Sequence, residues 1–233
     1  MYFLGDPHGH WAGILAKICN VSIPERSNII IPGDAGNGFA PLSRELENLQ
    51  DVEDNLRIYN VHVWMCRGNH DDPKFFDGSM DLKFPHIHFV KDYEVVEIEG
   101  MRVLFVGGAT SIDRALRREG ISWWPNEVFE LRETDAEPDI VVTHTAPSFC
   151  QPMALAHQIP ILGTDDRSDV HLVVEERELC KQLYENLKKK PRLWVYGHFH
   201  NHYFQVYDKT EFRGLAIMEL FEFTKDDLDN EIE

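Results

Sequence analysis

Five short clusters of acidic and histidine residues, each placed after an apolar strand-like run, constrain this chain more than any other feature. They are Asp6-Pro7-His8-Gly9, Gly33-Asp34, Gly68-Asn69-His70-Asp71, Thr143-His144 and Gly197-His198-Phe199-His200. Open α/β sheets bind their ligands in the loops at the carboxyl ends of strands. The pattern therefore predicts a fold in which these five loops meet at one site.

Seven side chains in these clusters are neutral or anionic nitrogen and oxygen donors: Asp6, His8, Asp34, Asn69, His144, His198 and His200. Seven donors are enough for two divalent metal ions about 3.5–4 Å apart that share one carboxylate, an arrangement that drives attack of water on phosphorus. Asp34 follows a Pro-Gly break and is the candidate for the shared ligand. Mixed nitrogen and oxygen ligation favours manganese, with iron, zinc or nickel as alternatives, over a thiolate-seeking metal.

Apolar periodicity predicts alternating strands and helices in the first third of the chain, which implies a largely parallel sheet with both faces covered. The expected strands are 2–4, 28–31, 60–66, 86–90, 93–98, 101–106, 140–143 and 193–196, with a closing hairpin of 202–207 and 214–220. The expected helices begin at Trp11 and Pro41 and continue at 111–119, 126–132 and 170–190. Residues 145–168 are expected to form an irregular loop near the site. We expect one domain over residues 1–233, with a frayed acidic tail at 225–233.

Composition limits the partners that such a chain can have. The 233 residues carry a net charge of -17, and two divalent ions would leave it strongly acidic. An acidic surface repels phosphate backbones, so a long nucleic acid is not an expected partner. None of the four cysteines forms a CxxC pair, and no apolar run is long enough to span a membrane. The start of the chain lacks the basic and apolar segments of a signal peptide, so a cytoplasmic location is expected. The oligomeric state is left open.

With these motifs in this order, the chain resembles the calcineurin-like metallophosphoesterase family, whose pattern reads D-x-H, GD, GNH[DE], H and GHxH. The resemblance implies a four-layer α/β/β/α sandwich with two mixed β-sheets. It implies that Asp6, His8, Asp34 and His200 hold one metal ion, and that Asp34, Asn69, His144 and His198 hold the other. A hydroxide that bridges the ions would attack phosphorus, and His70 would protonate or stabilise the leaving oxygen.

The chain departs from this family's protein phosphatases, which usually read GDxxDR after the bridging aspartate. Asn37 and Gly38 occupy the positions of the last Asp and Arg, which argues against a protein serine/threonine phosphatase. Arg67 is a candidate replacement for the missing phosphate-binding cation, or else it holds a loop by bridging to a carboxylate. Arg114 and Arg117 could grip a second phosphate, or belong to a solvated face. Trp123 and Trp124 could form an aromatic wall of the substrate pocket, or pack in the core.

These residues predict a dinuclear metal-dependent phosphoesterase acting on a small phosphomonoester or nucleotide-like substrate, with Asp34, His70 and Arg67 as the catalytic candidates. One alternative is a phosphodiesterase of cyclic nucleotides or other small diesters, and the protein serine/threonine phosphatase is a second. A further alternative, from another class, is a catalytically silent scaffold that keeps the fold for protein contacts. The loss of metal ligands would be the sign of a scaffold, and the sequence retains all seven.

Overall fold

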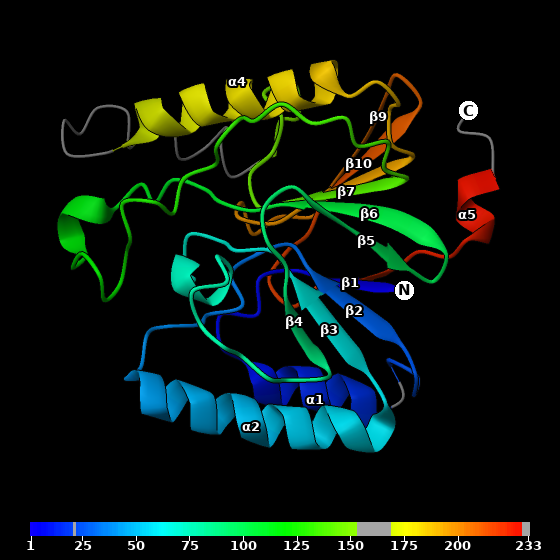
Figure 1. The fold of residues 1–233 in the computed structure, drawn as a ribbon. Helices are drawn as coiled ribbons and strands as arrows, with labels where there is room; N and C mark the ends of the chain where they lie inside the picture. The colour runs from blue at the N-terminus through cyan, green and yellow to red at the C-terminus, as the bar shows by residue number, and fades with distance from the viewer. Residues whose placement is uncertain (21, 153–168, 230–233) are drawn as a thin grey trace.

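Two β-sheets form the centre of the molecule in the computed structural model, which describes residues 1–20, 22–152 and 169–229 (Figure 1). The strands of the first sheet are β1 (Tyr2–Leu4), β2 (Asn28–Ile31), β3 (His62–Met65), β4 (Ile87–Phe89) and β11 (Leu220–Glu222). The strands of the second are β5 (Glu94–Ile98), β6 (Met101–Val106), β7 (Ile140–Thr143), β8 (Leu193–Tyr196), β9 (Tyr203–Tyr207) and β10 (Thr210–Gly214). Their spatial orders are β11-β1-β2-β3-β4 and β5-β6-β7-β8-β10-β9.

Helices cover the outer faces of both sheets. In the described residues the helices are α1 (Trp11–Cys19), α2 (Leu42–Tyr59), α4 (Val170–Asn186) and the short α5 (Asp226–Asp229), with 3₁₀ turns at Pro73–Phe75 and Arg114–Leu116. Figure 1 shows α1 and α2 against the first sheet and α4 against the second. Each sheet combines parallel and antiparallel pairs, for example β1 with β2 and with β11. The expected four-layer α/β/β/α sandwich with two mixed sheets is confirmed.

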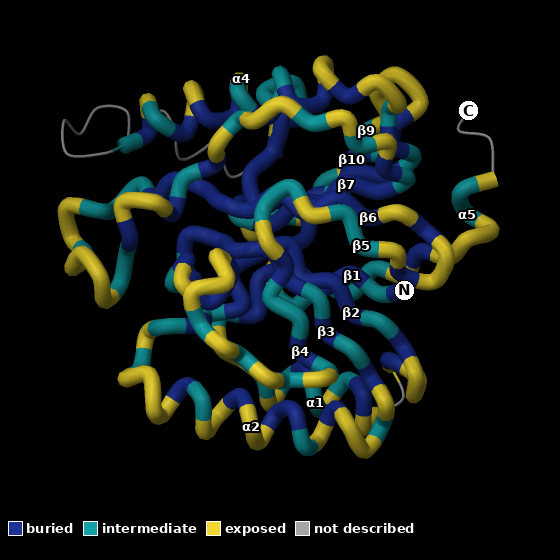
Figure 2. The backbone as a smooth tube through the Cα atoms, viewed as in Figure 1, coloured by how far each residue is buried: buried dark blue, intermediate teal, exposed yellow. Residues whose placement is uncertain are grey.

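Three apolar layers stabilise this arrangement, and the inner strands β2, β6, β7 and β8 are mostly buried (Figure 2). The middle layer lies between the sheets, where Phe3 and Ile30 pack in one cluster with Val103, Phe105 and Val142. A second cluster joins the first sheet to α1 and α2, and a third joins the second sheet to α4. Burial of apolar surface contributes about 25 cal/mol per Å². The strand ends are therefore carried by a packed, rigid frame.

The two helices expected at 111–119 and 126–132 do not form; a 3₁₀ turn at Arg114–Leu116 is the helical structure within them. Both segments give their hydrogen-bonding groups to distant partners instead. The buried Glu127 carboxylate accepts from the Ser111 backbone and the Arg114 side chain. The carbonyls of residues 126–128 accept from Arg67. Because a helix would use these backbone groups internally, the long-range contacts exclude it.

The end of the chain also differs from the expectation. A tight turn at Asp208 and Lys209, both with positive φ, pairs β9 with β10 rather than with residues 214–220. β11 pairs with β1 in the other sheet. The acidic tail forms α5 from residue 226, because Thr224 and Asp227 bond to each other at its start.

Three further expectations concern single segments. The helix expected to reach residue 190 ends at Asn186, since Leu187 is extended. Residues 145–152 are irregular as expected, whereas residues 153–168 of the same loop, like the tail beyond 229, lie outside the described residues. In the described part of the chain, no helix is long and apolar enough to cross a membrane.

Candidate metal centre

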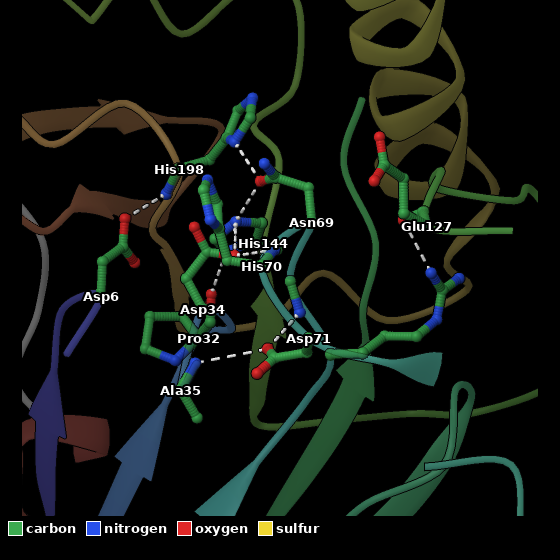
Figure 3. A network of polar contacts seen from close by, with 12 residues as sticks. Asp6, Pro32, Asp34, Ala35, Asn69, His70, Asp71, Glu127, His144 and His198 are labelled. Carbon is green, nitrogen blue, oxygen red and sulfur yellow. Dashed lines mark hydrogen bonds and ion pairs between the residues drawn. The ribbon is translucent and has the colours of Figure 1, made fainter. Parts of the chain in front are cut away.

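The structure brings all seven predicted donor residues to one place. β1, β2 and β3 are parallel neighbours, so their carboxyl ends lie at the same edge of the first sheet. The loops after them carry Asp6, His8, Asp34 and Asn69. The loops after β7 and β8, parallel neighbours in the second sheet, carry His144, His198 and His200. Figure 3 shows Asp34, Asn69, His144 and His198 turned toward one another, with Asp6 bonded to the loop of His198.

The first set of donors is formed by Asp6, His8, Asp34 and His200. One donor atom from each lies within 4.8 Å of all the others. The Nε2 atoms of His8 and His200 are 3.0 Å apart, and His200 Nε2 lies 3.4 Å from Asp6 Oδ2. His8 Nδ1 lies 3.8 Å from Asp34 Oδ2. The His8 and His200 side chains are 27% and 42% exposed, so this set faces solvent on its histidine side.

The second set contains the buried Asn69 and His144 together with the partly buried His198, and it shares Asp34 with the first. His144 Nε2 lies 3.1 Å from Asp34 Oδ1 and 3.0 Å from Asn69 Oδ1. His198 Nδ1 lies 2.9 Å from the same Asn69 oxygen. Asp34 therefore stands between the two sets, with Oδ2 toward His8 and Oδ1 toward His144.

The charges at this site fit divalent cations. Asp6 and Asp34 are 0% and 1% exposed, yet neither forms an ion pair with a lysine or arginine among the described residues. Asp6 Oδ1 is buried without any hydrogen-bond partner in the described part of the chain. Burial of an unpaired carboxylate is costly unless a cation compensates it. The residues present therefore fit divalent metal binding at this site.

The pKa values of Asp6, Asp34 and His144 are shifted by burial and by the charges of one another. Burial raises the pKa of Asp6 to about 8, and the charge of Asp34 adds to the rise. Burial acts to raise the pKa of Asp34 too, but the charge and hydrogen bond of His144 outweigh it and hold that pKa well below its usual range. Burial in turn lowers the pKa of His144, and the Asp34 carboxylate overcomes this and raises it to about 9.

Backbone conformation explains why the donors come from short glycine-containing motifs. A Cβ atom on Gly68 would lie 2.1 Å from Asp34 Oδ1, and one on Gly197 would lie 2.1 Å from Asp6 Oδ1. Glycine at both positions leaves room for the carboxylates. Five of the seven donor residues themselves have positive φ, which L-residues adopt at a cost of about 1–3 kcal/mol each: Asp6, His8, Asp34, His198 and His200. Such strain is typical of functional sites.

Several residues hold the donors in place. His144 Nδ1 lies 2.6 Å from the Pro32 carbonyl, so its proton is on that nitrogen and Nε2 faces the site (Figure 3). Ser111 Oγ accepts from Asn69 Nδ2 at 3.1 Å, and the Ser111 backbone donates to buried Glu127. Sequence reasoning missed Ser111 in this role, because a serine before a predicted helix resembles a cap, and it missed Glu127, which has no local signal.

Asp71 and Asn37 connect the loops rather than assist a histidine. The Asp71 carboxylate accepts from the backbone of Ala35, Gly36, Asn37 and Gly68. Asn37 Nδ2 donates to Asp71, and Asn37 Oδ1 has no hydrogen-bond partner among the described residues. The loops after β2 and β3 are thus fixed to each other by Asp71.

His70 lies beside the donors and meets Arg117. The His70 backbone donates to Asp34 Oδ1 at 2.7 Å, and its ring is 5.0 Å from that of His8. An Arg117 NH2 group lies 3.0 Å from His70 Nε2. Because arginine can only donate, Nε2 accepts this bond. Burial and the charge of Arg117 lower the pKa of His70, against the opposing effect of Asp34.

The geometry assigns Arg67 to the frame rather than to the reaction. Arg67 is 6% exposed, and its guanidinium pairs with Asp92 at 2.8 Å. All of its nitrogens are engaged, by Asp92 and by the carbonyls of residues 126–128. This is the loop-holding alternative from the sequence, and a guanidinium so fully engaged is not available to a phosphate.

The remaining substrate-binding candidates divide between the site and the core. Arg114 pairs with buried Glu127 at 3.0 Å and lies over the Trp123 ring. Trp124 is 5% exposed, which matches core packing, but its ring edge contacts Phe39. Of the two arginines, Arg117 is the one that reaches His70.

Comparison with known proteins identifies this arrangement. The model of a family described as calcineurin-like phosphoesterase matches residues 1–202. No curated protein sequence matches the chain. One matching solved structure comes from work on a novel archaeal phosphodiesterase; the match has 13% sequence identity, covers 93% of this chain and 84% of that chain, and has a TM-score of 0.39. A likeness this weak carries no argument about substrate.

Proposed function

Because the chain belongs to the calcineurin-like phosphoesterase family, and is thus a metal-dependent phosphoesterase, we propose that it uses two divalent ions to hydrolyse a small phosphate ester. The observation that carries the proposal is the convergence of seven donors around two buried carboxylates that lack a lysine or arginine partner in the described residues. Asp6, His8, Asp34 and His200 would hold one ion. Asp34, Asn69, His144 and His198 would hold the other.

When bound, the two ions would neutralise charge that develops on the phosphoryl group and make water more acidic at neutral pH. Manganese is the ion we propose, since imidazole, carboxylate and amide oxygen together suit it. The exposed His8 and His200 mark the side from which the substrate enters.

His70 and Arg117 would act on the substrate itself. His70 lies next to the donors and can supply a proton to the leaving oxygen. The Arg117 guanidinium lies 3.0 Å from that imidazole and could replace the arginine of the GDxxDR motif, whose position is occupied by Gly38 in this chain. A phosphoryl oxygen would take over the hydrogen bond that the guanidinium gives to Nε2, while Asp113 and Ser122 keep Arg117 next to His70. Nε2 would then take up a proton from solvent and pass it to the leaving oxygen.

Hydrolysis of two chromogenic esters tests the proposal. We expect turnover of para-nitrophenyl phosphate or bis-para-nitrophenyl phosphate with added manganese, and loss of turnover with chelator. Faster hydrolysis of the monoester supports a phosphatase, whereas faster hydrolysis of the diester supports the phosphodiesterase alternative. If protein that is shown to contain two metal ions per chain hydrolyses neither ester, the proposal is contradicted and the scaffold alternative is favoured.

A further inference from the structure

Phe39 is an exposed aromatic residue held against the proposed proton donor. It follows the glycine-rich stretch after Asp34, and 42% of its surface is exposed. Its ring stacks on the His70 imidazole, with 5.7 Å between centroids and 21° between planes. Its other ring contact is with Trp124, edge to face at 5.6 Å. A large apolar side chain thus faces solvent at the point where a leaving group would depart.

The backbone around Phe39 is fixed, so its position does not depend on the exposed ring. The Glu45 carboxylate accepts from the backbone of Gly38 at 3.2 Å and of Ala40 at 2.9 Å. Glu45 is itself buried in the first turn of α2. Gly38 has a φ of +103° and packs on Asp72, where a Cβ atom would come within 2.5 Å. These contacts fix the loop backbone and thereby the position of Phe39 beside His70.

Arg117 completes a second wall next to the same imidazole. Its Nε atom pairs with Asp113 at 2.7 Å, and its Nη1 atom donates to the Ser122 carbonyl at 3.2 Å. These contacts hold the planar guanidinium beside His70 Nε2. A phenyl ring and a guanidinium both bind flat, conjugated groups through their faces. An alkyl group would make only ordinary apolar contacts with the Phe39 ring and the Arg117 guanidinium.

We propose that Phe39, together with Arg117, forms a leaving-group subsite that selects phosphate esters carrying a planar aromatic ring next to the ester oxygen. This inference rests on the proposed function, since it places the ring of the leaving group beside the proton donor. Stacking of one aromatic pair corresponds to a preference of about 3- to 10-fold.

Non-hydrolysable phosphonates test the subsite without depending on turnover. Calorimetry would measure phenylphosphonate and methylphosphonate binding to the manganese-loaded protein. We expect the phenyl compound to bind more tightly by about 3- to 10-fold. Phe39→Leu should remove this preference and leave methylphosphonate affinity unchanged, while Phe39→Tyr should retain it. Phe204→Leu, which changes a phenylalanine of similar exposure on β9, is the matched control and should have no effect.

Two results would overturn the subsite. One is equal affinity of the wild-type protein for both phosphonates. The other is an equal loss of both affinities in Phe39→Leu, which would mean that Phe39 only supports His70. These results are distinct from failure of the proposed function: a protein that hydrolyses esters without aryl preference lacks the subsite alone. A protein that prefers the aryl phosphonate but hydrolyses no ester retains the subsite and lacks the activity.

Discussion

Removal of the Ser111 hydroxyl should weaken one of the two metal-binding steps and leave the other unchanged. Ser111 is 1% exposed, and its Oγ accepts from Asn69 Nδ2 at 3.1 Å. This bond directs the opposite side of the amide, Oδ1, toward His144 and His198. Ser111→Ala leaves a buried amide donor without its partner, at a cost of about 1–3 kcal/mol. The Ser111 backbone bond to Glu127 is retained, so the loop itself should keep its place.

The expected loss of affinity follows from that cost. Mutation of a residue that orients a metal ligand lowers metal affinity by about 10- to 100-fold. This corresponds to about 1.4–2.7 kcal/mol, in the same range as the cost of the unpaired amide. The weaker step belongs to the set that includes Asn69, whereas the hydrogen bonds of Ser111 within the described part of the chain go to Asn69 and Glu127.

Titration calorimetry with manganese on chelator-treated protein would measure both steps. Ser148→Ala is a suitable control, because that hydroxyl bonds to Glu178 in an exposed contact unrelated to the donors. Binding of both ions by Ser111→Ala within twofold of wild type would refute the reasoning, since Asn69 would then need no orientation or would not be a ligand. Equal weakening of both steps would point to a general disturbance of the loop.

Three other predictions concern the shared ligand, the frame and the response to acid. Asp34→Asn should lower kcat by at least about 10²-fold and reduce metal content below two ions per chain in elemental analysis; near-normal turnover would contradict a shared ligand. Arg67→Met should cost up to about 3–5 kcal/mol in urea unfolding, because it leaves the Asp92 carboxylate, whose side chain is only 11% exposed, without its ion-pair partner. It should not change KM, and a raised KM at unchanged stability would instead support a role of Arg67 in substrate binding. Burial and the neighbouring His62 lower the pKa of His88 from 6.5 to about 4. The unfolded chain then binds more protons than the folded one between these pH values, so stability is retained above about pH 6.5 and lost toward pH 4. Because this ring is partly exposed, we expect the free energy of unfolding to fall by about 1–2 kcal/mol between pH 6.5 and pH 4 on its account. If the unfolding free energy of His88→Gln falls with pH as steeply as that of the wild type, the prediction is wrong.

Much of the fold follows from the sequence because its strands are short, apolar and buried. The strands at 2–4, 28–31, 101–106, 140–143 and 193–196 have the expected bounds. Most side chains of each run are apolar and buried, and the polar clusters that follow several of them mark the strand ends. The meeting of the donors follows too, since parallel neighbours place their carboxyl ends at one edge.

The segment 111–132 could not be predicted in the same way. Its local pattern favours helices, but buried Glu127 and Arg67 take up the backbone groups that helices need. Those partners lie far apart along the chain, for example Arg67 and the carbonyl of Glu127, so no local window contains the information. Phe39 could not be predicted for another reason. A single exposed aromatic residue shows no periodicity in the sequence, and its functional interpretation depends on its ring contact with His70.

The supply of donors from both sheets has a consequence for the lifetime of the protein in a cell. If the proposed ions are held jointly by loops of the two sheets, they would bind the folded sandwich and not the unfolded chain, and each would add about 2.7 kcal/mol of stability at a hundredfold excess over its Kd. Stability changes of this size alter how often a chain unfolds and is degraded, and so its abundance. Scarcity of the metal would therefore reduce the number of molecules as well as the activity of each one.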